Sequence, residues 1–114
     1  MKKEIAQKWC EALRSGEYIQ GKQYLQKGNK FCCLGVLCDL ATKEGVCNKS
    51  IDLYNIADFD KYFCGLPKSV IDWSGMKSRH GMYDDQKTLA TCNDSLNKTF
   101  SEIADIIEEK WEQL

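Results

Sequence analysis

The stretch FCCLGVLCDL, residues 31–40, places three cysteines, Cys32, Cys33 and Cys38, among apolar residues. Such a group could bind zinc, carry out redox chemistry, supply a nucleophile or pack in a core. Structural zinc sites usually pair their cysteines as C-x2-C, and neighbouring side chains point apart. The spacing here is different, so we expect no metal, and nothing in the sequence calls for another cofactor.

A catalytic thiol requires a lowered pKa and a nearby base. Cys33 lies at the predicted start of a helix, where the helix dipole favours the thiolate, but the only candidate base is His80 in a distant loop. Cysteine is also among the most frequently buried residues. We therefore predict that the three thiols pack in the core, that Gly35 lets another element approach closely, and that Cys33 is the thiol nearest a site.

Acidic pairs offer the only other catalytic candidates, and they are ordinary surface patterns. The pairs are Asp84-Asp85, Asp58 with Asp60, and Glu108-Glu109. The sequence has no P-loop, no dinucleotide-binding fingerprint and no G-x-S-x-G elbow. Whether the protein is an enzyme is left open, and the balance favours a non-enzymatic protein.

A turn after the first predicted helix carries groups suited to phosphate and base recognition. The segment RSGEYIQGK holds Arg14, Tyr18, Gln20 and Lys22. Arginine binds phosphate with two parallel hydrogen bonds, and a tyrosine ring gives a stacking surface. We predict that Arg14 and Lys22 bind phosphate. The simpler alternative is that Arg14 forms a salt bridge.

Three further residues complete the predicted ligand site. Asn93 and Asp94 precede the last helix and could hydrogen-bond a base or a ribose, and Trp73 is an alternative to Tyr18 for stacking. The alternative for Asn93 and Asp94 is that they cap a turn.

The hydrophobic spacing predicts a compact α+β domain over residues 1–114, with about four helices and a small antiparallel sheet or hairpin. The helices are expected at 2–15, at 33–44, from Pro67 to Gly75, and from a capping box at Thr99 to the end of the chain. The other predicted elements are a hairpin at 23–32, a strand with an irregular turn in 46–66, a mobile loop or weak hairpin at 76–88, and a helical turn at 89–92.

Composition limits the possible partners. The chain has 114 residues and a net charge of −1, which argues against binding extended nucleic acid. No apolar run is long enough to cross a membrane, and MKKEIAQKW lacks the apolar segment of an export signal. The seven cysteines are an odd number, which favours reduced thiols in a cytoplasm.

Four segments in this order, WCEALRSGEYIQG, FCCLGVLCDL, LPKSVIDW and LATCNDSLNKTFSEIADIIE, resemble a widespread group of small tailed-phage and prophage proteins. The chain departs from that pattern at Cys92, where leucine is usual, and at Gln23, where glycine is frequent. The resemblance implies a phage accessory protein acting in the host bacterial cytoplasm. By analogy with phage anti-defence proteins, we expect a homo-oligomer that binds and sequesters a small nucleotide-derived immune signal.

Two alternatives remain open from the sequence. One is a protein-interaction module that inhibits a host or phage protein through residues 76–88 or the acidic last helix. The other is an enzyme that degrades the signal by phosphodiesterase-type chemistry, in which His80 or Asp94 would be essential.

Overall fold

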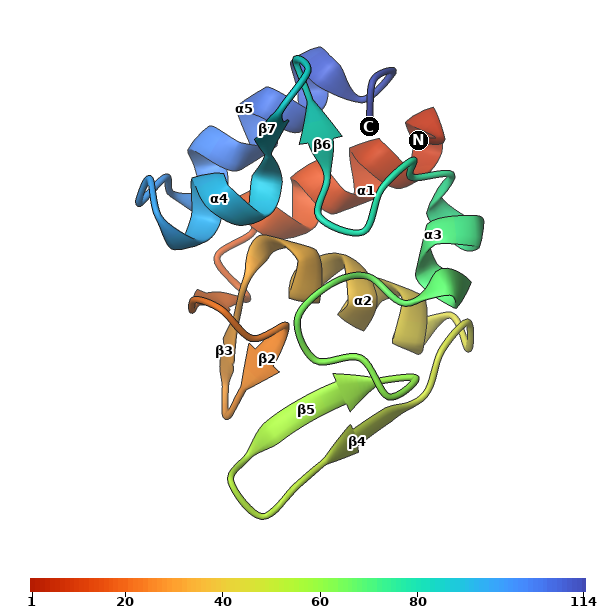
Figure 1. Cartoon of the computed structure of the whole chain (residues 1–114), viewed down its shortest axis with the longest axis vertical. Coiled ribbons are helices and arrows are strands. Elements are labelled where there is room, and N and C mark those ends of the chain that lie inside the picture. The colour runs from red at the N-terminus through yellow and green to blue at the C-terminus, as the bar shows by residue number, and fades with distance from the viewer.

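The computed structural model describes all residues from Met1 to Leu114 and shows an α+β domain of five helices and seven short strands (Figure 1). The helices are α1 (Lys3–Arg14), α2 (Cys33–Lys43), α3 (Lys68–Ser74), α4 (Leu89–Asp94) and α5 (Phe100–Lys110). The strands are β1 (Ile19–Gln20), β2 (Gln26–Lys27), β3 (Lys30–Phe31), β4 (Lys49–Ile51), β5 (Ile56–Phe59), β6 (Met82–Tyr83) and β7 (Lys87–Thr88). The fold class is therefore confirmed.

Helix α2 is the centre of the molecule. Figure 1 shows it crossing the middle of the domain, with the sheet on one side and α1 and α5 on the other. Its predicted apolar stripe, Leu34, Leu37, Cys38 and Ala41, is at most 1% exposed. The burial of this stripe between two layers explains why the helix is apolar over so much of its surface.

Gly35 brings α2 into direct contact with the chain before β2. A Cβ atom built on Gly35 would lie only 1.7 Å from the backbone oxygen of Leu25. Any other residue would therefore force the helix and the sheet apart. The expectation that Gly35 permits a close approach is confirmed.

The main sheet has five strands in the order β1-β3-β2-β5-β4, and β6 and β7 form a separate two-stranded ribbon. Strand β1 runs parallel to β3, and every other pairing is antiparallel. In the register of the central strands, Gln26 faces Phe31 on one side and Ala57 on the other. The predicted hairpin at 23–32 is the β2–β3 pair, with Gly28 at a φ of 61° in its turn.

Helices α1 and α5 lie antiparallel along the opposite layer. The Met1 ammonium donates to the Trp111 carbonyl at 3.0 Å, and the Cys10 thiol donates to the Ala104 carbonyl at 3.4 Å. These contacts place the start of α1 beside the end of α5. Helix α5 begins with the predicted capping box, in which Thr99 and Glu102 exchange hydrogen bonds.

Several element boundaries differ from the sequence predictions. Residues 46–66 contain a complete hairpin, β4–β5, because Asn55 adopts a positive φ in its turn without a glycine. Pro67 is the N-cap of α3 and not its first residue. Helix α5 ends at Lys110, and the buried Leu114 is reached by a turn. Residues 76–88 form the β6–β7 hairpin, turning at Asp84 and Asp85 with positive φ.

None of the helices combines the length and the apolar character needed to cross a bilayer.

Candidate functional site

Asn93, fully buried at the end of α4, connects three parts of the chain. Its Oδ1 accepts hydrogen bonds from Gln20 Nε2 at 2.9 Å and from the Cys33 backbone N–H at 3.2 Å. Its Nδ2 donates to the Gly21 carbonyl at 2.8 Å and to Asp94 Oδ1 at 2.9 Å. We call these five residues the Asn93 network.

The Asn93 network changes the predicted role of this asparagine. An amide can donate twice and accept twice, and all four positions are taken by the protein itself. Asn93 is also 0% exposed. The structure therefore leaves Asn93 no free donor or acceptor for the predicted base or ribose, and its hydrogen bonds hold the β1 loop, α2 and α4 together.

Lys22 borders this network, and its members Asp94 and Gln20 make further hydrogen bonds. Asp94 Oδ1 also accepts from the Gln23 backbone N–H at 3.0 Å, and Lys22 Nζ bonds to Asn97 Oδ1. Gln20 additionally donates to the Lys98 carbonyl at 2.8 Å. The structure thus brings five of the predicted residues together, and their hydrogen bonds connect separate segments of the chain. These residues are Gln20, Lys22, Cys33, Asn93 and Asp94.

Tyr18 belongs to a second polar group, on the exposed side of α2. Its hydroxyl donates to Asp39 Oδ2 at 2.6 Å, and Lys49 Nζ donates to Asp39 Oδ1 at 3.0 Å. Burial acts to raise the pKa of Asp39, but the hydrogen bonds from Tyr18 and Lys49 outweigh it and hold the pKa below its usual value. The Tyr18 ring packs edge-on against Phe31 at 5.0 Å between centroids, so it does not present a free stacking surface.

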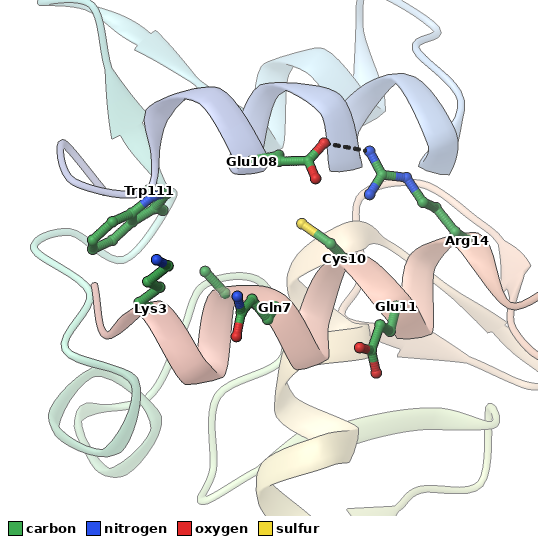
Figure 2. Close-up of a pocket in the computed structure, with 8 residues that line it drawn as sticks. Lys3, Gln7, Cys10, Glu11, Arg14, Glu108 and Trp111 are labelled. Carbon is green, nitrogen blue, oxygen red and sulfur yellow. Dashed lines mark hydrogen bonds and ion pairs between the residues drawn. The ribbon is translucent and has the colours of Figure 1, made fainter.

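Arg14 lies away from both groups, at the end of α1. Its Nη2 pairs with Asp105 Oδ1 at 2.6 Å and with Glu108 Oε2 at 3.1 Å (Figure 2). The hydrogen bonds to Asp105 and Glu108 raise the pKa of Arg14, and the two carboxylates balance the charge of its guanidinium. The salt-bridge alternative is confirmed, and the prediction that Arg14 clamps a phosphate together with Lys22 is not supported by this arrangement.

Trp73 is also separate, on α3. It is half-buried and packs against the hydrophobic core. The eight predicted residues therefore do not form one ligand site.

The three cysteines of the FCCLGVLCDL segment, Cys32, Cys33 and Cys38, are core residues. Cys33 is completely buried and its thiol points to the Leu89 carbonyl at 3.6 Å, whereas His80 is exposed. Burial raises the pKa of Cys33 and Cys38 well above the ordinary value and that of Cys32 to about 11. A nucleophile requires a shift in the opposite direction. Core packing of these three thiols is confirmed, and the complete burial of Cys33 gives no support to the prediction that it lies nearest a ligand site.

An exposed surface that the sequence did not single out combines aromatic rings with unpaired cations. It consists of two clusters, Tyr24 with Lys27 and Phe63, and Tyr62 with Arg79, which adjoin at the neighbouring residues Tyr62 and Phe63 and which together we call the aromatic patch. The rings of Tyr24 and Phe63 lie 6.3 Å apart, and the Arg79 guanidinium lies 5.0 Å from the Tyr62 ring centroid. Lys27 Nζ lies 5.7 Å from the Tyr24 centroid.

Backbone contacts hold the segments of the aromatic patch together. The Leu25 N–H donates to the Phe63 carbonyl at 2.8 Å, and the Leu66 N–H donates to the Arg79 carbonyl at 3.0 Å. The sequence signal was the pair Tyr62-Phe63 directly after the Asp60-Lys61 turn, two adjacent aromatic residues that cannot both face the core of a strand. Their partners come from distant parts of the chain, so the sequence alone did not assemble the patch.

The structure is a small α+β domain with a buried asparagine network at Asn93 and with aromatic and cationic side chains on its surface. The chain belongs to the family described as "Domain of unknown function (DUF8296)", whose family model matches residues 1–111. No curated protein and no solved structure matches the chain.

Proposed function

We propose that this protein is a non-enzymatic binding protein that recognises a nucleotide-derived ligand through the aromatic patch, acting as a phage accessory factor that sequesters an immune signal. The observation that carries the proposal is the free guanidinium of Arg79 stacked 5.0 Å from the exposed ring of Tyr62. The phage setting comes from the sequence resemblance.

The charges distinguish Arg79 from Arg14. Arg79 makes no ion pair and no side-chain hydrogen bond, whereas Arg14 is bound by two carboxylates. A guanidinium without a carboxylate partner keeps its donors for a phosphate. Lys27 on the same patch is likewise free of any ion pair, so the patch favours an anion.

The rings supply the second half of the recognition. Phe63 is 50% exposed and Tyr62 is 42% exposed, so both rings are accessible from the solvent. Bases stack on aromatic side chains with about 1–3 kcal/mol per base. Aromatic faces beside unpaired cations therefore match a ligand with both a base and a phosphate.

The test is calorimetric titration with mononucleotides, cyclic mono- and dinucleotides and ADP-ribose, with inorganic phosphate and adenosine as partial ligands. We expect one nucleotide class to bind, Arg79→Ala to weaken it at least tenfold, and Arg14→Ala to leave it unchanged. The ligand recovered afterwards should be intact by chromatography. Absence of binding to the whole panel, or equal affinity in Arg79→Ala, would refute the proposal, and a degraded ligand would favour the enzyme alternative.

A second candidate, inhibition of a host or phage protein, is favoured by the tip of the β4–β5 hairpin. Leu53 is 99% exposed, Tyr54 is 77% exposed and Ile51 is 58% exposed. Exposed apolar groups of this size often mark protein contacts. A stoichiometric partner that co-purifies with wild type and with Arg79→Ala, but not with the Leu53→Asp, Tyr54→Asp double variant, would favour this function.

A further inference from the structure

A groove between α1 and α5 has a volume of about 500 Å³. Figure 2 shows Lys3 and Trp111 near one end of it and Arg14 near the other, with the Cys10 thiol between the helices. Its charged lining residues balance, since Lys3 and Arg14 oppose Glu11 and Glu108. A groove with balanced charges does not favour a small anion, so it is distinct from the aromatic patch in the chemistry it can recognise.

Three residues of α1 form an unpartnered stripe along this groove. Lys3, Gln7 and Glu11 follow one another at intervals of four residues and so share one side of the helix. All three are exposed, and none makes an ion pair or a side-chain hydrogen bond within the chain. The stripe is positive at its start, neutral in its middle and negative at its end, over about 12 Å at the helical rise.

We infer that this groove is the contact surface for a second copy of the same chain, with a two-fold axis beside Gln7 that sets the two α1 helices antiparallel. In that arrangement Lys3 of each copy faces Glu11 of the other, and the two Gln7 amides meet at the axis. A parallel arrangement would place Lys3 against Lys3 and Glu11 against Glu11. Charge complementarity therefore selects the antiparallel pair.

The rest of the groove is compatible with the same axis. Ala6 and Cys10 are small residues on its floor, which lets a second pair of helices approach closely. Because Trp111 and Arg14 lie at opposite ends, the axis brings each Trp111 ring toward Arg14 of the second copy, a combination that favours a cation–π contact. The result is a four-helix arrangement of two α1–α5 pairs.

Sedimentation velocity over a concentration series tests this inference with charge reversal. We expect wild type to reach twice the monomer mass. Lys3→Glu and Glu11→Lys should each raise the dimer Kd at least tenfold, because each places like charges together at two symmetric positions. Lys30→Glu, on β3 and away from the groove, makes the same change in net charge as Lys3→Glu and should leave the Kd unchanged.

The decisive measurement is the mixture of the two single variants. Lys3→Glu in one copy and Glu11→Lys in the other restore opposite charges at both contacts, so an equimolar mixture should form heterodimers about as tightly as wild type forms homodimers. The double variant Lys3→Glu, Glu11→Lys should also dimerise. The inference would be overturned if wild type stayed monomeric up to millimolar concentration. It would also be overturned if the charge reversals left the dimer Kd unchanged. Neither result bears on ligand binding at Arg79, which is measured separately.

Discussion

The side-chain oxygen of Asn93 accepts a hydrogen bond from the backbone N–H of Cys33 at 3.2 Å, and this bond joins α4 to the first turn of α2. The first N–H groups of a helix have no partner within the helix, and here a buried asparagine from a distant segment supplies one. The two residues come from segments that are 60 positions apart in the sequence. Their bond places the cysteine-rich segment beside the Asn-Asp segment in the fold.

Replacement of Asn93 should be among the most destabilising changes in the chain. Asn93→Ala removes the partners of the Cys33 N–H and the Gly21 carbonyl, and we expect a loss of about 3 kcal/mol in the free energy of unfolding, measured by urea denaturation. Asn48→Ala, at an exposed asparagine whose side chain makes no hydrogen bond, is the control and should change stability by less than about 0.5 kcal/mol. A similar small effect for Asn93→Ala would contradict the network.

Gly35→Ala should prevent folding or cost more than about 4 kcal/mol, because the added Cβ would lie 1.7 Å from the Leu25 carbonyl oxygen. The matched control is Gly45→Ala, where the φ is 75° but no atom lies within 4 Å of the added group. We expect that control to lose only about 1 kcal/mol from backbone strain. Thermal unfolding followed by circular dichroism would compare the two, and equal losses would show that α2 can move away from Leu25.

Gln23→Gly should stabilise the protein. Gln23 has a φ of 71°, a region that glycine occupies easily and other residues at a cost of about 1–2 kcal/mol. After allowing for the greater freedom of glycine in the unfolded chain, we expect a gain of about 0.5–1 kcal/mol in denaturant titration. Lys22→Gly, at the neighbouring residue without a positive φ, should not stabilise. A loss of stability in Gln23→Gly would mean that its side chain contributes more than its backbone costs.

The unfolding free energy should depend on Asp39 at acidic pH. Because the folded-state pKa of Asp39 lies below its usual value of about 3.9, the stability it contributes is complete above that pH and is lost as pH falls through the folded-state pKa. Asp39→Asn should lose about 2 kcal/mol at pH 7 and show a weaker decline in stability between pH 5 and 3. Asp72→Asn, in an exposed pair with Lys68, should change little. Parallel pH curves for Asp39→Asn and wild type would argue against this role.

Alkylation of the native protein should modify one thiol quickly. Cys64 is exposed and the other six cysteines are buried, so iodoacetamide should reach Cys64 first and the others only after unfolding. Intact-mass spectrometry would show one added group in native buffer and seven in denaturant. Cys64→Ser should then remain unmodified in native buffer. A second rapid addition would identify a thiol that local opening exposes.

The patterns of the sequence determined most of the fold, because local rules fix local structure. The spacing of Leu34, Leu37 and Cys38 determined that α2 is buried, and the residues Thr99 and Glu102 determined where α5 begins, since a capping box is formed within one turn. The hairpin β4–β5 was not predicted, because its turn uses Asn55 and has no glycine.

The tertiary structure alone decided which polar side chains are free. Arg14 and Arg79 are the same residue type in the sequence, but α5 brings Asp105 and Glu108 to Arg14, and no carboxylate pairs with Arg79. Likewise, Asn93 is a structural residue because two distant segments, at Gln20-Gly21 and at Cys33, converge on its amide. Whether a side chain is available to a ligand depends on what the rest of the chain places beside it, and that is a property of long-range packing, which sequence spacing does not encode.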